Sequence, residues 1–161
     1  MTSYARDRAG AWGEAVMPDA TRYRELYATS GWRAGLTIGT ESYAGGIKQK
    51  WTAVEWTQDD ESLTYRKNPR VKESSVQDKE GNARRTEIDY HPATYYPGGK
   101  DLGLAKDVKE YGAGAQANTV LRRTRTEYNL SAEYMTAGVV GLVSERYVYG
   151  RVASGGEELF S

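Results

Sequence analysis

Few residues of this 161-residue chain have the types and spacing that catalysis or metal binding requires. Cysteine is absent and His91 is the one histidine, which excludes thiolate nucleophiles, disulfides and metal sites that need a histidine pair. His91 precedes Pro92, and no Gly-x-Ser-x-Gly motif supplies a serine nucleophile for it to activate. We therefore interpret His91 as a surface-loop residue, and we predict no catalytic, cofactor-binding or metal-binding residue and no enzymatic activity.

Three short stretches imitate ligand-binding motifs. Residues 112–117 resemble a dinucleotide fingerprint but lead into a strand-like segment, so no helix N-terminus is present to hold a pyrophosphate. Residues 98–101 lack the upstream glycine and the Ser/Thr of a phosphate loop. Both stretches are predicted to be turns. The acidic run 59–61 lacks the alternating ligands of a calcium loop and is interpreted as a solvated link.

The charge balance argues against nucleic acid as a partner. Lys plus Arg and Asp plus Glu both total 22, so the formal net charge is zero. The basic pairs 84–85 and 122–123 are each followed by acidic residues, which favours a salt-paired sheet surface. The sequence contains no run of 18 apolar residues, so no membrane span is predicted. Residues 1–13 lack the apolar region of a signal peptide. The compartment is left open by these features.

The aromatic composition is unusual, with 13 Tyr and 4 Trp against 1 Phe. Tyr and Trp suit surfaces that are half buried and half wet, as in thin layers. Two interpretations follow: the aromatics fill the layer between adjacent hairpins, which we favour, or they form a stacking platform for sugars in a carbohydrate- or small-ligand-binding β-barrel or sandwich. The platform would consist of Trp51, Trp56, Tyr90 and Tyr128, extended by Trp32 and Tyr43.

An internal repeat is the most informative feature of the chain. Segments 50–56, 84–90 and 122–128 each read basic, any, Thr, any, β-branched, acidic, aromatic, at offsets of 34 and then 38 residues. A second anchor runs nearly in step with the first: Val71-Lys72-Glu73, Val108-Lys109-Glu110 and Val143-Ser144-Glu145.

Each repeated segment alternates with period two, which is typical of a strand with one covered face. The charged residues then share the outer face, where opposite charges on adjacent strands can pair. The inward residues, which we predict to form the repeat core, are Thr52, Val54, Trp56, Thr86, Ile88, Tyr90, Thr124, Thr126 and Tyr128.

Turn signals between the anchors predict β-hairpins. Gly and Asn in residues 45–46, 78–82 and 112–118 supply the positive φ angles of tight turns, and residues 57–69 and 92–103 are the longer links. Residues 1–20 lack strand character and are predicted to be irregular. We therefore expect an all-β fold in which residues 21–161 form a tandem array of β-hairpins, as part of a curved sheet.

The repeats resemble those of RHS/YD-repeat proteins, a family that includes bacterial Rhs toxins, the cocoon chains of Tc toxins and the teneurins. Residues 78–82, Asp-Lys-Glu-Gly-Asn, match the turn half of the family motif, and residues 147–151, Tyr-Val-Tyr-Gly-Arg, match its aromatic pair and Gly-Arg. Residues 118–130 look like the strand between two such turns. Gln77 stands where the motif has its tyrosine. The resemblance covers about residues 35–151.

The resemblance implies a structural role. In this family the hairpins spiral into a hollow β-shell, which in toxins encloses an effector. The shell-closing segment with its protease aspartates is not found, so no autoproteolytic role is carried over. The expectation is a non-catalytic scaffold segment, a piece of a larger RHS polypeptide. Its partners would be the rest of that polypeptide or the enclosed effector, and its location would be secreted or at the cell surface.

Overall fold

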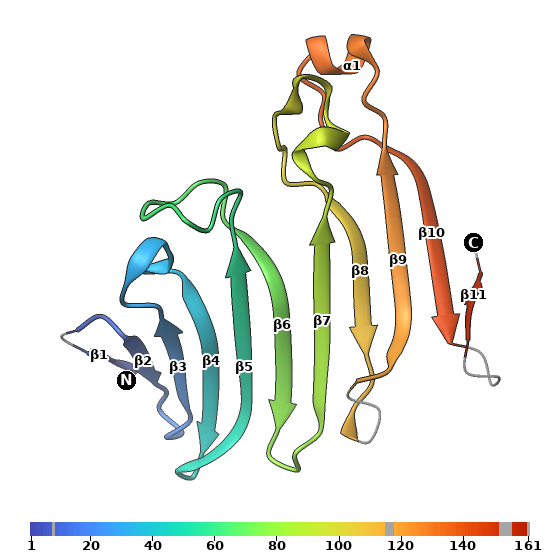
Figure 1. The fold of residues 1–161 in the computed structure, drawn as a ribbon. Helices are drawn as coiled ribbons and strands as arrows, with labels where there is room; N and C mark the ends of the chain where they lie inside the picture. Colours follow the sequence, from blue (N-terminus) through green and yellow to red (C-terminus); the bar gives the residue numbers. More distant parts are fainter. Residues whose placement is uncertain (8, 115–117, 152–155, 161) are drawn as a thin grey trace. The chain divides into compact units, whose positions relative to one another are not determined.

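The computed structural model describes residues 1–7, 9–114, 118–151 and 156–160. Eleven strands follow one another in the sheet in their sequence order, and the paired strands run antiparallel (Figure 1). The predicted all-β class built from hairpins is confirmed. The chain divides into two compact units, Met1–Arg85 with Ala113–Ala117 and Thr86–Gly112 with Asn118–Ser161, and each is described by itself.

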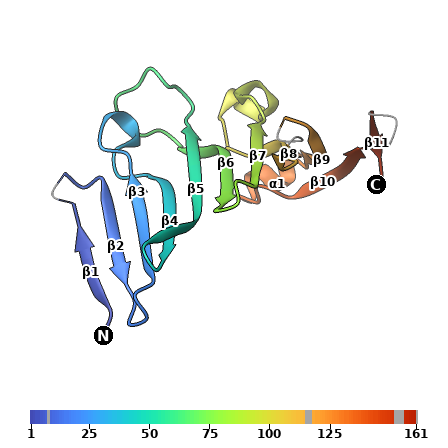
Figure 2. The same cartoon turned by 90° about the horizontal axis from the view of Figure 1, so that it is seen from below.

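Unit 1 is a meander of short hairpins, and its strands follow one another in a single layer (Figure 2). One 3₁₀ turn, η1 (Gly31–Arg33), lies in the connection before β4. The strands are β1 (Ser3–Arg6), β2 (Trp12–Val16), β3 (Arg22–Tyr27), β4 (Thr37–Ala44), β5 (Ile47–Thr57), β6 (Arg70–Asp78) and the first residues of β7 (Ala83–Tyr90).

The prediction that residues 1–20 are irregular is wrong. Strand β1 pairs with β2, with Ser3 opposite Val16 and Arg6 opposite Gly13, and β2 pairs in turn with β3. The two strands have only 4 and 5 residues, and glycine interrupts the second. An alternating pattern over so few positions does not distinguish a strand from an irregular segment. Strands this short are stabilised by pairing with a neighbouring strand, which the local sequence does not reveal.

Unit 2 contains the rest of β7 and the strands that follow. Two 3₁₀ turns, η2 (Ala93–Tyr95) and η3 (Pro97–Gly99), lie between β7 and β8, and a short helix, α1 (Ala132–Thr136), lies between β9 and β10. The strands are β8 (Ala105–Tyr111), β9 (Val120–Tyr128), β10 (Val143–Arg151) and β11 (Glu157–Leu159). Among the described residues, no helix has the length and apolar character needed to span a membrane.

The tight turns lie where glycine predicted them. Gly45 and Gly46, at φ 56° and 80°, join β4 to β5. Gly81, at φ 89°, joins β6 to β7, and the Asn82 amide donates a 2.9 Å hydrogen bond to the Asp78 carboxylate. The predicted turn 112–118 connects β8 to β9, although its residues 115–117 lie outside the described part of the chain.

The described residues bury few side chains. Trp32 and Gln58 are buried in unit 1, and His91, Tyr96, Asp107 and Thr126 are buried in unit 2. Of the nine predicted core residues only Thr126 is buried, and the other eight are half-buried. Residues of both faces are half-buried, such as the neighbours Trp51 and Thr52. The alternating pattern predicted one covered and one exposed face, whereas in the structure both faces of the strands carry half-buried residues.

Candidate functional site

The end of strand β5 has a specific backbone arrangement, which we call the strand-end junction. Glu55 lies opposite Glu73 and Trp56 lies opposite Val71, so Lys72 is an extra residue that forms a bulge in β6. An acidic pair, a bulged residue and an aromatic residue thus meet where the long connection 58–69 leaves β5.

Two junctions in unit 2 have the same register. Strand β7 places Asp89 opposite Asp107 and Tyr90 opposite Ala105. Strand β9 places Glu127 opposite Glu145 and Tyr128 opposite Val143. In all three junctions the partner of the aromatic residue lies 15 positions later, from 56 to 71, from 90 to 105 and from 128 to 143.

A fourth junction closes β3, and the repeat pattern missed it. Tyr27 lies opposite Thr37, and Ile38 is the bulged residue before Gly39. The backbone closes three of these four connections in the same way: the residue after the aromatic donates to the residue before its partner. The bonds are Ala28 to Leu36 at 3.0 Å, His91 to Leu104 at 3.1 Å and Asn129 to Leu142 at 2.8 Å. Leu26 precedes Tyr27 where the other copies have an acidic residue, so this segment does not match the repeat motif in the sequence.

One predicted anchor was out of register. Val108 lies opposite Ile88 in mid-strand, whereas Ala105 occupies the place of Val71 and Val143. The equivalent segment is therefore Ala105-Lys106-Asp107, and the Val-Lys-Glu of residues 108–110 is a coincidence of charge alternation. A shift of three positions preserves neither the face nor the bulge, which only the pairing reveals.

The predicted core residues of unit 2 share one face. Ile88 lies opposite Val108, Val108 opposite Thr124, and Thr124 opposite Val148. This row of β-branched side chains crosses four strands. In unit 1, Thr52 lies between Thr40 and Val76, and its hydroxyl is 2.9 Å from that of Thr40.

Acidic residues directly opposite one another repel, so the junctions need cations nearby. Lys109 lies 2.8 Å from Asp89 and also bonds to Glu87, and these hydrogen bonds raise the pKa of Lys109. Equivalent ion pairs join adjacent strands in both units. They are Glu55 with Lys72 (3.2 Å), Glu73 with Arg85 (3.2 Å) and Asp107 with Arg123 (3.1 Å), whereas Glu127 pairs with Arg125 of its own strand, β9 (3.1 Å).

His91 is not the surface-loop residue that the sequence predicted. It is 3% exposed, and its Nε2 lies 3.0 Å from the carbonyl oxygen of Thr126, to which the ring must donate. The ring stacks on Tyr95 with centroids 3.6 Å apart and meets the Tyr128 ring edge-on at 5.8 Å. The connection 91–104 folds back over the end of β9, which buries a histidine that the sequence places beside a loop proline.

A carboxylate borders this aromatic cluster. Glu127 lies 3.8 Å from His91 Nε2 and accepts a 3.1 Å hydrogen bond from the Tyr95 hydroxyl. Burial disfavours the charged Glu127, but the hydrogen bonds from Arg125 and Tyr95 outweigh it and hold its pKa below the usual range. Burial raises the pKa of Tyr95. The Nε2 hydrogen of His91 is donated to the Thr126 carbonyl. The cluster of His91, Tyr95 and Tyr128 therefore has a structural role and holds the connection 91–104 against the end of β9.

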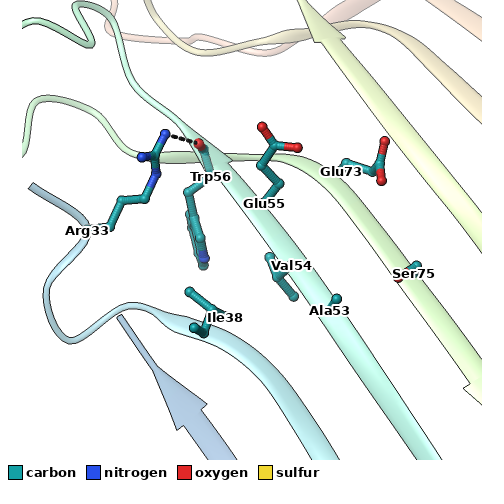
Figure 3. A pocket seen from close by; sticks show the side chains of 8 residues that line it. All are labelled: Arg33, Ile38, Ala53, Val54, Glu55, Trp56, Glu73 and Ser75. Carbon is teal, nitrogen blue, oxygen red and sulfur yellow. Dashed lines mark hydrogen bonds between the residues drawn. The ribbon is translucent and has the colours of Figure 1, made fainter. Parts of the chain in front are cut away.

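A groove of about 440 Å³ lies at the β5 junction (Figure 3). The Trp56 ring stands beside Ile38 and donates a 2.7 Å hydrogen bond to the Thr37 carbonyl. Arg33 donates to the Trp56 carbonyl at 3.3 Å. The carboxylates of Glu55 and Glu73 border the groove on the side of β6. Apolar, acidic and basic groups therefore line one shallow hollow.

The aromatics of the alternative sugar platform fall into separate settings. Tyr43 and Trp51 share Lys48, whose ammonium lies 5.8 Å and 5.4 Å from their ring centres. Arg33 covers Trp32 at 4.4 Å, and that ring is buried. The Tyr128 hydroxyl donates to the Ala105 carbonyl at 3.0 Å. Cations occupy ring faces of Trp32, Tyr43 and Trp51.

The remaining motif-like stretches lie in connections. Asp59 pairs with Arg70 at 3.0 Å, Asp60 accepts hydrogen bonds from Ser62, and Glu61 pairs with Arg33 at 3.2 Å. Gly98 and Gly99 adopt φ 77° and 67° in η3. In the described part of the chain, no group of three His, Asp or Glu residues is arranged to hold a metal ion.

Comparison with known proteins adds no relative. No family model matches the chain, and neither a curated protein nor a solved structure matches it. The repeated strand-end junction is accordingly the feature on which a functional argument depends.

Proposed function

We propose that this chain is a non-catalytic structural segment of an RHS/YD-repeat toxin or cell-surface protein and contributes to an encapsulating β-shell. The observation that supports the proposal is the strand-end junction, repeated with one register at Trp56, Tyr90 and Tyr128 and in a shorter form at Tyr27. A ligand-binding domain requires a single binding site. A β-shell built from tandem hairpins requires the same connection between strands to recur along the chain.

The thin layer supports the same role. Each strand is stabilised mainly by its neighbours, as in repeat proteins, and few side chains are buried. Strands β1 and β11 stand at the ends of the strand order, so each has one neighbour among the described strands. Unpaired backbone groups at such edges favour pairing with further strands. The rest of a larger RHS polypeptide, or an enclosed effector, is the partner that we propose.

Deleting one repeat tests the proposal. Removal of residues 53–86 joins Thr52 to Glu87, so that Ile88 and Tyr90 take the places of Val54 and Trp56 on the same face. A modular array loses one hairpin and keeps its cooperative unfolding and its strand content per residue, measured by circular dichroism during a urea titration. A ligand-binding domain that folds as one indivisible unit loses strands that it needs and unfolds.

A control deletion differs by one residue. Removal of residues 53–87 joins Thr52 to Ile88 and turns Ile88 and Tyr90 to the opposite face. We expect this variant to be unfolded or aggregated while the first stays folded. Equal loss of structure in both variants contradicts the proposal. Quenching of tryptophan fluorescence by added cello-oligosaccharides also contradicts it and favours a carbohydrate-binding module.

A further inference from the structure

A second groove, of about 320 Å³, lies on unit 1 across β1, β2 and β3. Tyr4 lies opposite Ala15, and Ala15 lies opposite Tyr23, so the three side chains share one face of the sheet. Gly13, two positions before Ala15, lies opposite Glu25. The floor of the groove therefore carries a methyl group and a hydrogen, with tyrosines standing on both sides.

The tyrosine rings are open to solvent. Tyr4 is 83% exposed and Tyr23 is 42% exposed, and the ring of Tyr27, which also borders the groove, lies over Gly13. Adjacent strands lie about 4.8 Å apart, so the strands that carry Tyr4 and Tyr23 are about 10 Å apart. That spacing leaves room for one small, rounded group between two aromatic faces.

Glu25 sets the charge of the groove. It accepts a hydrogen bond from the Tyr27 hydroxyl. The other strand glutamates of unit 1 have cationic partners: Glu14 pairs with Arg24, Glu41 with Lys48, Glu55 with Lys72 and Glu73 with Arg85. Among the described residues, Glu25 has no such ion pair. Arg6, opposite Gly13, is exposed and does not line the groove.

We propose that Tyr4, Tyr23, Tyr27 and Glu25 form a binding site for a trimethylammonium group. Aromatic faces attract a cation through the ring quadrupole, and quaternary ammonium ions give up their weak hydration readily on entering such cages. The Glu25 carboxylate supplies the complementary charge, and the small side chain of Ala15, between Tyr4 and Tyr23, supplies the space. The site is independent of the proposed wall function.

Ligand-observed NMR with the 161-residue chain tests the site. Choline is the probe, and 3,3-dimethyl-1-butanol is its neutral isostere. We expect saturation transfer to the choline methyl protons, with millimolar affinity, and none to the isostere. Equal transfer to both ligands, transfer to the isostere alone, or no transfer to choline overturns the proposal. Tighter binding of an N-acetyl-trimethyl-lysine ester than of choline identifies a protein side chain as the source, and the reverse order identifies a small solute.

Two variants locate the binding. Glu25→Gln keeps the acceptor for the Tyr27 hydroxyl but removes the charge, and we expect it to weaken choline binding about tenfold. Tyr4→Ala, on the exposed edge strand, should weaken binding about fivefold. Tyr134→Ala, which alters an exposed tyrosine of α1, is the matched control and should change nothing. Unchanged affinity in both groove variants, with native circular dichroism, contradicts the assignment.

Discussion

The connections 57–70 and 91–104 are alike in span and different inside. Each leaves an aromatic residue, Trp56 or Tyr90, and returns to a partner 15 positions later beside a bulge. Between these ends the first connection is closed by a polar network and the second by stacked rings. The repeat therefore requires the same ends of the connection, and it allows different side chains in the interior.

Gln58 organises the first connection. Its side-chain amide donates a 2.7 Å hydrogen bond to the Asp60 carbonyl and accepts one of 3.0 Å from the Lys67 amide. Arg66 also donates to the carbonyls of Trp32 and Ala34 in the preceding connection. Hydrogen bonds therefore link the two neighbouring connections of unit 1.

Rings organise the second connection. His91 stacks on Tyr95, and the buried Tyr96 accepts a 3.0 Å hydrogen bond from the Leu104 amide. The Tyr95 hydroxyl also accepts a 2.9 Å hydrogen bond from the Tyr128 amide, which fixes the connection to the end of β9. The junction thus depends on the aromatic, the bulge and the acidic pair, while the interior of the connection varies.

The largest expected effect is the loss of the His91 ring. His91→Ala removes a buried stacking partner and leaves the Thr126 carbonyl without its donor, so we expect a loss of about 2–4 kcal/mol in the free energy of unfolding. Urea denaturation followed by circular dichroism measures this loss. A change below about 1 kcal/mol would show that the ring cluster does not stabilise the connection.

A smaller effect is expected in the polar connection. Gln58→Ala leaves the Asp60 carbonyl and the Lys67 amide without their partner but removes no stacked ring, and we expect a loss of about 1–2 kcal/mol. Hydrogen exchange should accelerate in residues 58–69 and stay unchanged in residues 91–104. Equal acceleration in both connections would contradict the independence of the two interiors.

The pH dependence of Glu127 is smaller still. Its pKa in the folded protein is lowered, so its stabilising contribution is present above the unfolded pKa of about 4.3 and is lost as the pH falls through the folded value. The stability difference between the wild type and Glu127→Gln should therefore be constant at neutral pH and shrink as the pH falls below the unfolded pKa of about 4.3. We expect a few tenths of a kcal/mol in urea titrations, since Glu127 is partly exposed. A difference that is constant with pH contradicts the ion-pair account.

The exposed pair at the β5 junction should contribute least. Lys72 lies 3.2 Å from Glu55, and both side chains are more than half exposed. Lys72→Ala keeps the bulge and removes only a surface ion pair, so we expect a change within about 0.5 kcal/mol in thermal unfolding. A larger loss would mean that the acidic pair Glu55 and Glu73 needs this cation to stay together.

The strands with long alternation were predictable, and the junctions were not. Segments 84–90 and 122–128 alternate over seven residues and appear as β7 and β9, and glycine marked the tight turns. The hairpin of β1 and β2 was missed because its alternation is too short. The burial of His91 and the place of Ala105 depend on contacts between segments that no local pattern records. The groove at Tyr4 and Tyr23 likewise exists only because β2 brings both tyrosines opposite Ala15.

Engineered disulfides test the shared junction most directly, because the chain has no cysteine of its own. Asp89 and Asp107 lie directly opposite each other, at a backbone separation that a disulfide can span. Asp89 and Glu110 are the pair that aligning Val108 with Val71 requires, and they lie about 10 Å apart along the strand direction. We predict that oxidation of the native protein closes the disulfide in the double variant Asp89→Cys, Asp107→Cys and leaves free thiols in Asp89→Cys, Glu110→Cys, as mass spectrometry would show. The opposite outcome would contradict the repeated junction.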